Sequence, residues 1–288
     1  MVLELKNIQY KYNVGMSSEI EAIKDVNLVI KSGEFVGIIG HTGSGKSTLI
    51  QHFNGLLKPT GGEVLCDGED IFDKKYDIRR HRCNVGMVFQ YPEHQLFESS
   101  IIEDVCFGPL NKGLSKDDAY KAAKKALSLV GITEDLYEKS PFELSGGQKR
   151  RVAIAGVLAM DPEMLILDEP TAGLDPVGRD AIYKLLTELC AEKGIAVVVV
   201  SHSMEDMAKY AKRLIVMYRG TVLFDDVPNE VFKHRDELEK CGLTVPKISY
   251  IMDKIMQAGV PVRTDIINME DAKEELIRVL TGFKNYGK

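Results

Sequence analysis

The chain has 288 residues, of which 44% are hydrophobic and 28% are charged. That length allows one large domain, or one medium domain with an appendage, and the composition excludes a disordered or fibrous protein. The formal net charge of −6 at pH 7 argues against a basic face that would bind nucleic acid.

The five cysteines are scattered, without a CxxC pair or a Cys/His spacing suited to zinc. We interpret them as reduced thiols in a cytoplasmic protein. The N-terminal MVLELKNIQY lacks the apolar stretch of a signal peptide, and the longest apolar runs, such as residues 152–160 and 195–200, are too short to span a bilayer. We therefore expect any connection to a membrane to run through a partner.

The first predicted elements are strands. Apolar clusters in residues 2–30 alternate around a polar, glycine-containing stretch, which predicts antiparallel strands joined by a loop. The apolar run at residues 35–39 predicts another strand, followed by the glycine-rich segment 40–45 and then a helix. Further on, Asp67-Gly68 predicts a tight turn. The apolar residues at helical spacing after the glycine segment are Leu49, Ile50, Phe53, Leu56 and Leu57.

The pattern becomes helical from about Tyr91. Ser115 and Asp118 have the spacing of a capping box, and Gly131 follows the apolar face as a helix stop. We therefore predict an inserted helical subdomain at about residues 91–160.

Two later apolar runs, residues 164–167 and 195–200, have the pattern of parallel strands that are buried on both faces. Between them, Asp175 can cap a helix that begins at Pro176 and stops at Gly194. The core is thus predicted to be an α/β sheet in which strands alternate with helices.

The composition shifts after about Asn229, and the tail carries two helical patterns. One has an apolar Ile/Met face, and the other can be capped by Asn268 and Asp271. We treat the tail as a small separate unit. Its apolar residues are Ile248, Ile251, Met252, Ile255 and Met256 in the first pattern and Ala272, Leu276 and Leu280 in the second.

Residues 40–47, GHTGSGKS, match the pattern GxxxxGK[ST] in the strand-to-helix context that this motif requires. Glycines let backbone N–H groups turn toward a polyphosphate, and the following helix adds the positive end of its dipole. Lys46 is expected to reach the β and γ phosphates of ATP, and Ser47 to ligate Mg²⁺. The alternative is a flexible glycine turn, which the context disfavours.

Adjacent carboxylates, Asp168 and Glu169, end the buried run 164–167, where α/β sheets bind ligands. Asp168 is expected to hold Mg²⁺, and Glu169 to orient and deprotonate the attacking water. The alternative is a solvated acidic loop, and the presence of the glycine loop argues against it.

The segment LSGGQ at residues 144–148 selects among nucleotide-binding families. Ser145 and Gln148 have the spacing of a capping box and could simply satisfy their own helix start. Gly146 and Gly147 cost stability in a first helical turn, however, and leave backbone N–H groups open to an anion. The combination favours phosphate binding.

Together these motifs occur in the order found in ATP-binding cassette (ABC) ATPases, which the chain resembles over about residues 2–230. The resemblance implies an α/β P-loop NTPase fold with an antiparallel β subdomain, an inserted α-helical subdomain and a small C-terminal helical extension. The expected limits are 1–235 for the ATP-binding domain and 236–288 for a dimerisation extension. The motifs that carry it are Gly40 to Ser47, Gln90, Leu144 to Gln148, Leu165 to Glu169, Ala172 to Pro176 and His202.

What the resemblance implies for the site is a head-to-tail dimer, in which the glycine loop of one subunit and the Ser145 segment of the other enclose each ATP. Tyr12 is then expected to stack on adenine, with Tyr10 as the competing choice, and Gln90 to sense Mg²⁺ and water. Asp175 is expected to act across the dimer, and His202 to contact the γ-phosphate. The expected catalytic residues are Glu169, His202 and Gln90; the metal ligands are Ser47, Gln90 and Asp168; and the nucleotide-binding residues are Tyr12, Gly40, His41, Thr42, Gly43, Ser44, Gly45, Lys46, Ser47, Thr48, Ser145, Gly146, Gly147, Gln148 and Asp175.

A narrower resemblance is to the ATPase subunits of energy-coupling factor (ECF) vitamin importers, and to the second of their two A-type subunits. It implies that the groove near residues 90–97 receives helices of a membrane T component and that the tail helps two ATPase subunits form a heterodimer. The segments that carry it are His41, residues 51–59 (QHFNGLLKP), residues 88–97 (VFQYPEHQLF), Phe107 to Pro109, Asn111 and the tail after Gly242.

On this resemblance the chain is an ATP-hydrolysing subunit that powers uptake of a vitamin or related micronutrient. It would lie at the cytoplasmic face of the cell membrane with a T component and a substrate-binding S component, and would not bind nucleic acid. One alternative is the ATPase of another ABC importer. A second is a soluble ABC ATPase acting on nucleic acid or ribosomes, which the single cassette and the acidic pI disfavour. For the tail, packing of its apolar face on its own domain is the alternative to dimerisation.

Overall fold

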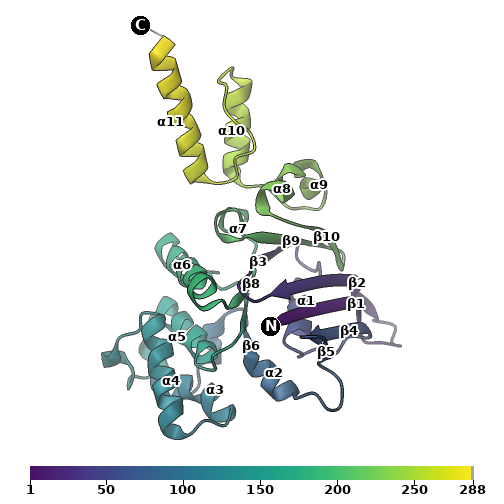
Figure 1. Cartoon of the computed structure of the whole chain (residues 1–288), viewed down its shortest axis with the longest axis vertical. Helices are drawn as coiled ribbons and strands as arrows, with labels where there is room; N and C mark the ends of the chain where they lie inside the picture. The colour runs from purple at the N-terminus through teal and green to yellow at the C-terminus, as the bar shows by residue number, and fades with distance from the viewer. Residues whose placement is uncertain (287–288) are drawn as a thin grey trace.

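Two β-sheets and the helices around them form the body of the molecule (Figure 1). The computed structural model describes residues 1–286, with side chains described through residue 281. The larger sheet has the strand order β10-β9-β3-β8-β7-β6, and the smaller sheet has the order β2-β1-β4-β5. The strands are β1 (Val2–Tyr12), β2 (Ile20–Lys31), β3 (Phe35–Ile39), β4 (Gly61–Cys66), β5 (Glu69–Asp70), β6 (Val85–Val88), β7 (Met164–Asp168), β8 (Ala196–Val200), β9 (Arg213–Tyr218) and β10 (Thr221–Asp226).

The centre of the larger sheet is parallel, as the continuous apolar runs predicted. Every residue of β3 and of β8 is buried, because helices and the smaller sheet cover both faces. The register pairs Ile38 of β3 with Val200 of β8, and Val200 in turn with Asp168 of β7. The carboxyl ends of these three strands therefore lie side by side at one edge of the sheet.

The smaller sheet confirms the predicted antiparallel strands, because β1 pairs with both β2 and β4. Asp67 and Gly68 have φ angles of 50° and 87° and make the predicted tight turn between β4 and β5. Helix α1 (Lys46–Phe53) follows the glycine loop but ends earlier than its apolar pattern predicted. Leu56 and Leu57 lie outside it, because Gly55 adopts φ 71° and ends the helical path.

The predicted inserted helices are present and pack on one another at the end of the molecule opposite the C-terminus (Figure 1). Ser115 caps α4 by accepting a hydrogen bond from the Asp118 N–H at 3.2 Å, and Gly131 ends that element at φ 71°. The remaining helices are α2 (Ile78–Asn84), α3 (Ile101–Asn111), α4 (Lys116–Leu129), α5 (Gly146–Leu158), α6 (Pro176–Lys193), α7 (Met204–Tyr210), α8 (Pro228–Lys233), α9 (Arg235–Lys240), α10 (Lys247–Gln257) and α11 (Met269–Tyr286), with 3-10 turns η1 (Pro92–Gln95), η2 (Glu134–Leu136) and η3 (Pro141–Glu143).

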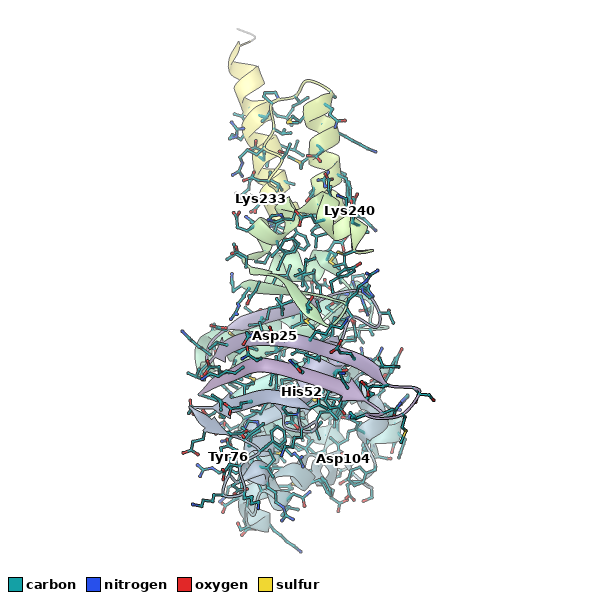
Figure 2. All side chains as sticks on the ribbon, turned by 90° about the vertical axis from the view of Figure 1, so that its right-hand side faces the viewer. Asp25, His52, Tyr76, Asp104, Lys233 and Lys240 are labelled. Carbon is teal, nitrogen blue, oxygen red and sulfur yellow. The ribbon has the colours of Figure 1, made fainter. Side chains whose placement is uncertain are left out.

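The C-terminal helices α10 and α11 project from the body beside each other, as Figures 1 and 2 show from two sides. Part of the predicted Ile/Met face is internal, since Ile248 and Met252 are buried, whereas Ile251 and Met256 are exposed. Val245 still belongs to the main core. Ile267, which precedes α11, also belongs to it, so a truncation after Pro246 keeps all of the buried main core except this residue. The domain limit at residue 235 remains a prediction. The small separate cluster of the tail contains Ile248, Met252, Val262, Ile266, Ala272 and Val279.

Within residues 1–286, none of the helices combines the length and the apolar character that crossing a membrane requires.

Candidate nucleotide-binding site

The glycine loop connects β3 to α1 and is tied closely to the strands around it. A Cβ on Gly45 would lie 2.6 Å from the Ala22 carbonyl oxygen, and its φ of 103° disfavours any side chain. A Cβ on Gly40 would lie 2.4 Å from the Met217 carbonyl oxygen. These two glycines are therefore required by the backbone path, which leads directly into the N-terminus of α1, where anions bind.

Lys46 lies at the centre of this loop. Its buried ammonium group donates hydrogen bonds to the carbonyl oxygens of Gly40, at 2.7 Å, and of His41, at 3.1 Å. Burial lowers the pKa of Lys46, while the nearby carboxylates of Glu169 and Asp168 oppose that shift. The loop thus holds a positive charge where the phosphates of a nucleotide can approach.

Ser47 and Asp168 meet although they are far apart in the sequence. The Ser47 hydroxyl donates a hydrogen bond of 3.0 Å to Oδ2 of Asp168, which ends β7. Burial raises the pKa of Asp168, and the Ser47 hydrogen bond opposes this. A hydroxyl and a carboxylate oxygen are hard ligands of the kind that Mg²⁺ prefers, so this pair fits the predicted metal site.

Glu169 has an unusual backbone and an unusual side chain. It adopts φ 50° and donates its N–H to the Val200 carbonyl oxygen at 3.0 Å, which fixes the chain as it leaves β7. The side chain is 14% exposed, and Oε1 lies 3.4 Å from Nε2 of His202. Burial, and secondly the charge of Asp168, raise the pKa of Glu169 to about 7. The carboxyl is therefore suited to exchange a proton near neutral pH.

His202 follows β8, so the sheet register brings it to Glu169. Burial, and secondly the charge of Lys46, lower the pKa of His202. The imidazole is consequently neutral at pH 7, and it can form a hydrogen bond with a carboxyl or phosphate group without adding a charge.

One cleft of about 340 Å³ collects most of the predicted residues. Gly40, His41 and Ser44 instead support the loop from behind; Ser44 is fully buried, and the His41 ring packs edge-on against Tyr218. The residues that line the cleft are Thr42, Gly43, Gly45, Lys46, Ser47, Thr48, Gln90, Asp168, Glu169, Val200 and His202.

The two candidate aromatic residues for adenine occupy different positions. The Tyr12 hydroxyl lies 3.0 Å from Oγ1 of Thr48, and its side chain is 37% exposed. Tyr10 packs edge-on behind it, with ring centroids 4.8 Å apart, and also contacts His52. Tyr12 is therefore the more exposed of the two and contacts a residue of the cleft lining, which favours it over Tyr10.

The segment 145–148 lies outside the cleft, at the start of α5. Ser145 and Gln148 form the capping box that the spacing allowed: the Gln148 N–H donates to Oγ of Ser145 at 3.3 Å, and the Ser145 N–H donates to Oε1 of Gln148 at 3.0 Å. A Cβ on Gly146 would meet no atom within 4 Å, and one on Gly147 only Leu174, at 3.8 Å. Packing within the described chain thus gives no reason for either glycine.

Asp175, the other residue that was predicted to act across a dimer, also lies outside the cleft lining. Its carboxylate accepts a hydrogen bond of 2.7 Å from the Gly178 N–H and so caps α6, as the sequence predicted.

Sequence reasoning missed one charged group close to these motifs. Arg150 is buried in α5, on the same stripe as Ile154 and Leu158, and pairs with Glu93. The only signal was a charged residue at an otherwise apolar helical position.

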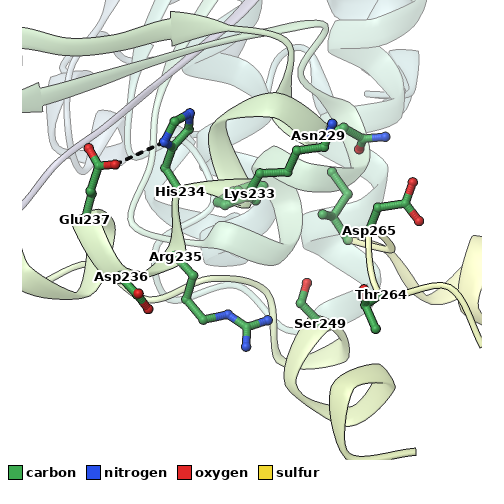
Figure 3. Close-up of a pocket in the computed structure, with 11 residues that line it drawn as sticks. Asn229, Lys233, His234, Arg235, Asp236, Glu237, Ser249, Thr264 and Asp265 are labelled. Atoms are coloured by element: carbon green, nitrogen blue, oxygen red, sulfur yellow. Dashed lines mark hydrogen bonds and ion pairs between the residues drawn. The ribbon is translucent and has the colours of Figure 1, made fainter. Parts of the chain in front are cut away.

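A second cavity, of about 470 Å³, lies between α8, α9, α10 and the chain before α11 (Figure 3). Its lysine and arginine already have acidic partners: Lys233 pairs with Glu230, and Arg235 with Asp253. These paired charges leave no free cation for a phosphate among the described residues of the cavity lining. No glycine loop is among these residues either.

The fold and the cleft define the class of protein: a P-loop ATPase with an inserted set of helices. The family model for "ABC transporter" matches residues 23–172. An energy-coupling factor transporter ATP-binding protein, EcfA2, of Caldanaerobacter subterraneus subsp. tengcongensis is 50% identical over 99% of this chain and 100% of its own length. The protein of the same description from Clostridioides difficile is 50% identical, covering 98% and 99%.

Solved structures agree with these sequence matches. The structure of cbiO1 from Clostridium perfringens, described as part of the ABC transporter complex cbiONQ, has a TM-score of 0.74 and 43% identity, over 87% of this chain and 98% of its own. The ATP-binding cassette MJ0796, in a dimeric post-hydrolysis state with ADP and phosphate, has a TM-score of 0.70 and 35% identity, covering 78% and 98%. The chain therefore belongs to the ABC transporter family and, within it, to the energy-coupling factor transporter ATP-binding proteins.

Proposed function

We propose that the chain is an ATP-hydrolysing subunit of an ECF importer and that the cleft around Lys46 holds the ATP whose hydrolysis drives transport. The observation that carries this proposal is the convergence of Lys46, Glu169 and His202 in one cleft. The cleft combines a cation that can bind phosphate, Lys46, with a buried carboxyl of pKa about 7, Glu169, which can accept a proton from water.

The glycine loop provides the binding step. Backbone N–H groups of the loop and the N-terminus of α1 would hold the polyphosphate, and Lys46 would exchange its two loop carbonyl partners for phosphate oxygens. Ser47 and Asp168, with Gln90 at the cleft wall, would hold Mg²⁺, which neutralises charge on the phosphates when it is bound. Tyr12 would stack on the adenine.

Glu169 provides the chemical step. Its carboxylate would take a proton from water as the water oxygen bonds to the γ-phosphorus and the bond from that phosphorus to the ADP oxygen breaks, which leaves ADP and phosphate. His202, neutral and 3.4 Å from Glu169, would hold the carboxylate in place and contact the γ-phosphate. Glu169 lines the cleft directly after β7, where its backbone adopts the left-handed φ of 50°.

The working unit is a head-to-tail dimer on this proposal. Gly146 and Gly147 meet almost nothing within their own chain, so their open backbone suits the phosphates held by a partner subunit. Asp175 would act across the same interface. The dimeric structure of the MJ0796 cassette supports a dimer as the working unit.

The C-terminal helices are proposed to help hold two ATPase subunits together, because they leave apolar side chains such as Ile251, Met256 and Leu280 exposed. Truncation after Pro246 is expected to weaken association with the second ATPase subunit and to leave ATP binding by residues 1–246 intact, since Ile267 is the one buried residue of the main core that it removes. Light scattering of the mixed subunits measures the association, and nucleotide titration measures the binding. Unchanged association would remove the dimerisation role of the tail.

The relatives are described as ATP-binding proteins of a transporter, which supports a membrane complex. We propose that this complex contains a second ATPase subunit, a T component and a substrate-binding S component for a vitamin or related micronutrient, with this chain on the cytoplasmic face. Affinity purification of the tagged chain from detergent-solubilised cells is expected to recover integral membrane proteins and a second ATPase subunit, and the purified complex should hydrolyse ATP. The Gly45→Val chain, whose glycine loop cannot form, is the control for activity. Recovery of ribosomes or DNA in their place would overturn the transport function.

A further inference from the structure

Arg150 connects three segments of the chain that the sequence keeps far apart. Its side chain is 3% exposed, and Nη2 donates hydrogen bonds of 3.1 and 3.2 Å to the two carboxylate oxygens of Glu93. Nη1 donates a third hydrogen bond, of 2.6 Å, to the Ala172 carbonyl oxygen. A buried arginine held in this way by a carboxylate and a carbonyl is a geometrically specific joint, because its donors lie in one rigid plane.

Both of the segments that Arg150 holds begin at a residue of the proposed site. Glu93 lies three residues after Gln90, and Ala172 lies three residues after Glu169. The Ala172 N–H also donates to the Glu169 carbonyl oxygen at 3.2 Å, so this turn is closed on the residue proposed to activate water. The contacts of Arg150 are therefore one short turn of chain away from both Gln90 and Glu169.

The two turns are also strained. Tyr91, directly after Gln90, has φ 55°, and Glu169 has φ 50°, although neither is glycine. Residues in this region persist only where the surrounding structure holds them there. The contacts of Arg150 with Glu93 and Ala172 supply such a restraint for both turns at once.

Arg150 itself belongs to α5, whose first turn is the segment 145–148. On the proposed function, that turn contacts the nucleotide held by the partner, whereas Gln90 and Glu169 contact the nucleotide held by this chain. A shift of α5 would therefore move the joint and, through it, both strained turns.

We propose that Arg150 is a positioning residue: its bonds to Glu93 and Ala172 couple the segment that serves the partner's ATP to Gln90 and Glu169 in this chain's own site. This inference rests on the proposed function and deepens it. It assigns to one buried arginine the communication between the two nucleotides of the dimer.

The test compares Arg150→Met, Glu93→Gln and the double variant in the copurified complex. Each is expected to leave the KM for ATP within about twofold and to lower kcat at least about tenfold, because small misplacements of catalytic groups cost that much. The double variant should melt at a higher temperature than Arg150→Met, since no carboxylate is stranded without its partner, yet its kcat should stay low. A melting temperature that recovers while kcat stays low distinguishes a positioning role of Arg150 from a role in folding alone.

Arg213→Met is the matched control. Arg213 is partly buried, with 27% of its side chain exposed, and it donates hydrogen bonds to Asp225, Glu34 and the Val29 carbonyl oxygen, but it lies outside the cleft lining. The Arg213→Met variant should have a lower melting temperature than the wild type but the same kcat in the folded complex. Two results would overturn the coupling while leaving the ATPase function in place. One is that Arg150→Met has the same kcat as Arg213→Met. The other is that the double variant regains kcat together with its melting temperature. A wild-type complex without ATP hydrolysis would overturn the proposed function and this inference with it.

Discussion

Replacing Glu169 with glutamine is expected to lower the kcat for ATP about 10²- to 10⁴-fold, as the loss of a general base does. The amide has nearly the shape of the carboxyl but cannot take a proton from water. ATP binding should stay close to wild type, because Lys46 and the glycine loop, which hold the phosphates, are unchanged. Steady-state phosphate release gives kcat, and titration of the purified variant with ATP gives the affinity.

The pKa of Glu169 adds a signature to that experiment. Because the free carboxyl titrates at about 7 and acts in its ionised form, wild-type kcat/KM should rise with pH through about 7, and the residual activity of the variant should not. Glu163→Gln is the control: Glu163 precedes the opposite end of β7 and is half exposed. It should keep both the wild-type rate and the wild-type pH profile. A Glu169→Gln enzyme with near-normal turnover would remove Glu169 from the mechanism.

The sequence predicted which residues would lie together in the cleft around Lys46 where these residues are close in the sequence or end neighbouring strands. The strand, the glycine loop and α1 are continuous in the sequence, so a local pattern was enough to find Lys46 and Ser47. The acidic pair at 168 and 169 followed from a buried apolar run, and parallel strands bring their carboxyl ends together. That Glu169 lies within 3.4 Å of His202, and that burial raises its pKa, required the register of β7 and β8.

The errors also have physical reasons. The apolar spacing that predicted a longer first helix continues through Leu57, but Gly55 turns the chain, and periodicity does not report a backbone angle. Arg150 was missed because helical spacing places a residue on a face without saying what its side chain reaches. Its partner Glu93 is 57 residues away in the sequence. Ordinary statistics would put such a charge at the surface.

Gly147→Asp is expected to lower ATP turnover by the assembled dimer about 100-fold or more, as the removal of preorganised transition-state contacts does. The sequence left two interpretations of residues 145–148 open, a capping box or a phosphate contact, and the structure shows the capping box together with two glycines that the chain's own packing does not require. A carboxylate at position 147 has room within the subunit, so folding should be preserved. It would nevertheless place a negative charge against the partner's phosphates, at the N-terminus of α5.

The effect should appear only in the assembled protein. The isolated Gly147→Asp subunit should bind ATP as the wild type does, since the cleft around Lys46 does not include residue 147. Gly156→Asp is the matched control, because Gly156 lies in the same helix and a Cβ there also meets no atom within 4 Å. That variant should retain turnover. If instead Gly147→Asp weakened ATP binding by the isolated chain, the segment would serve its own nucleotide, and the head-to-tail arrangement would be wrong.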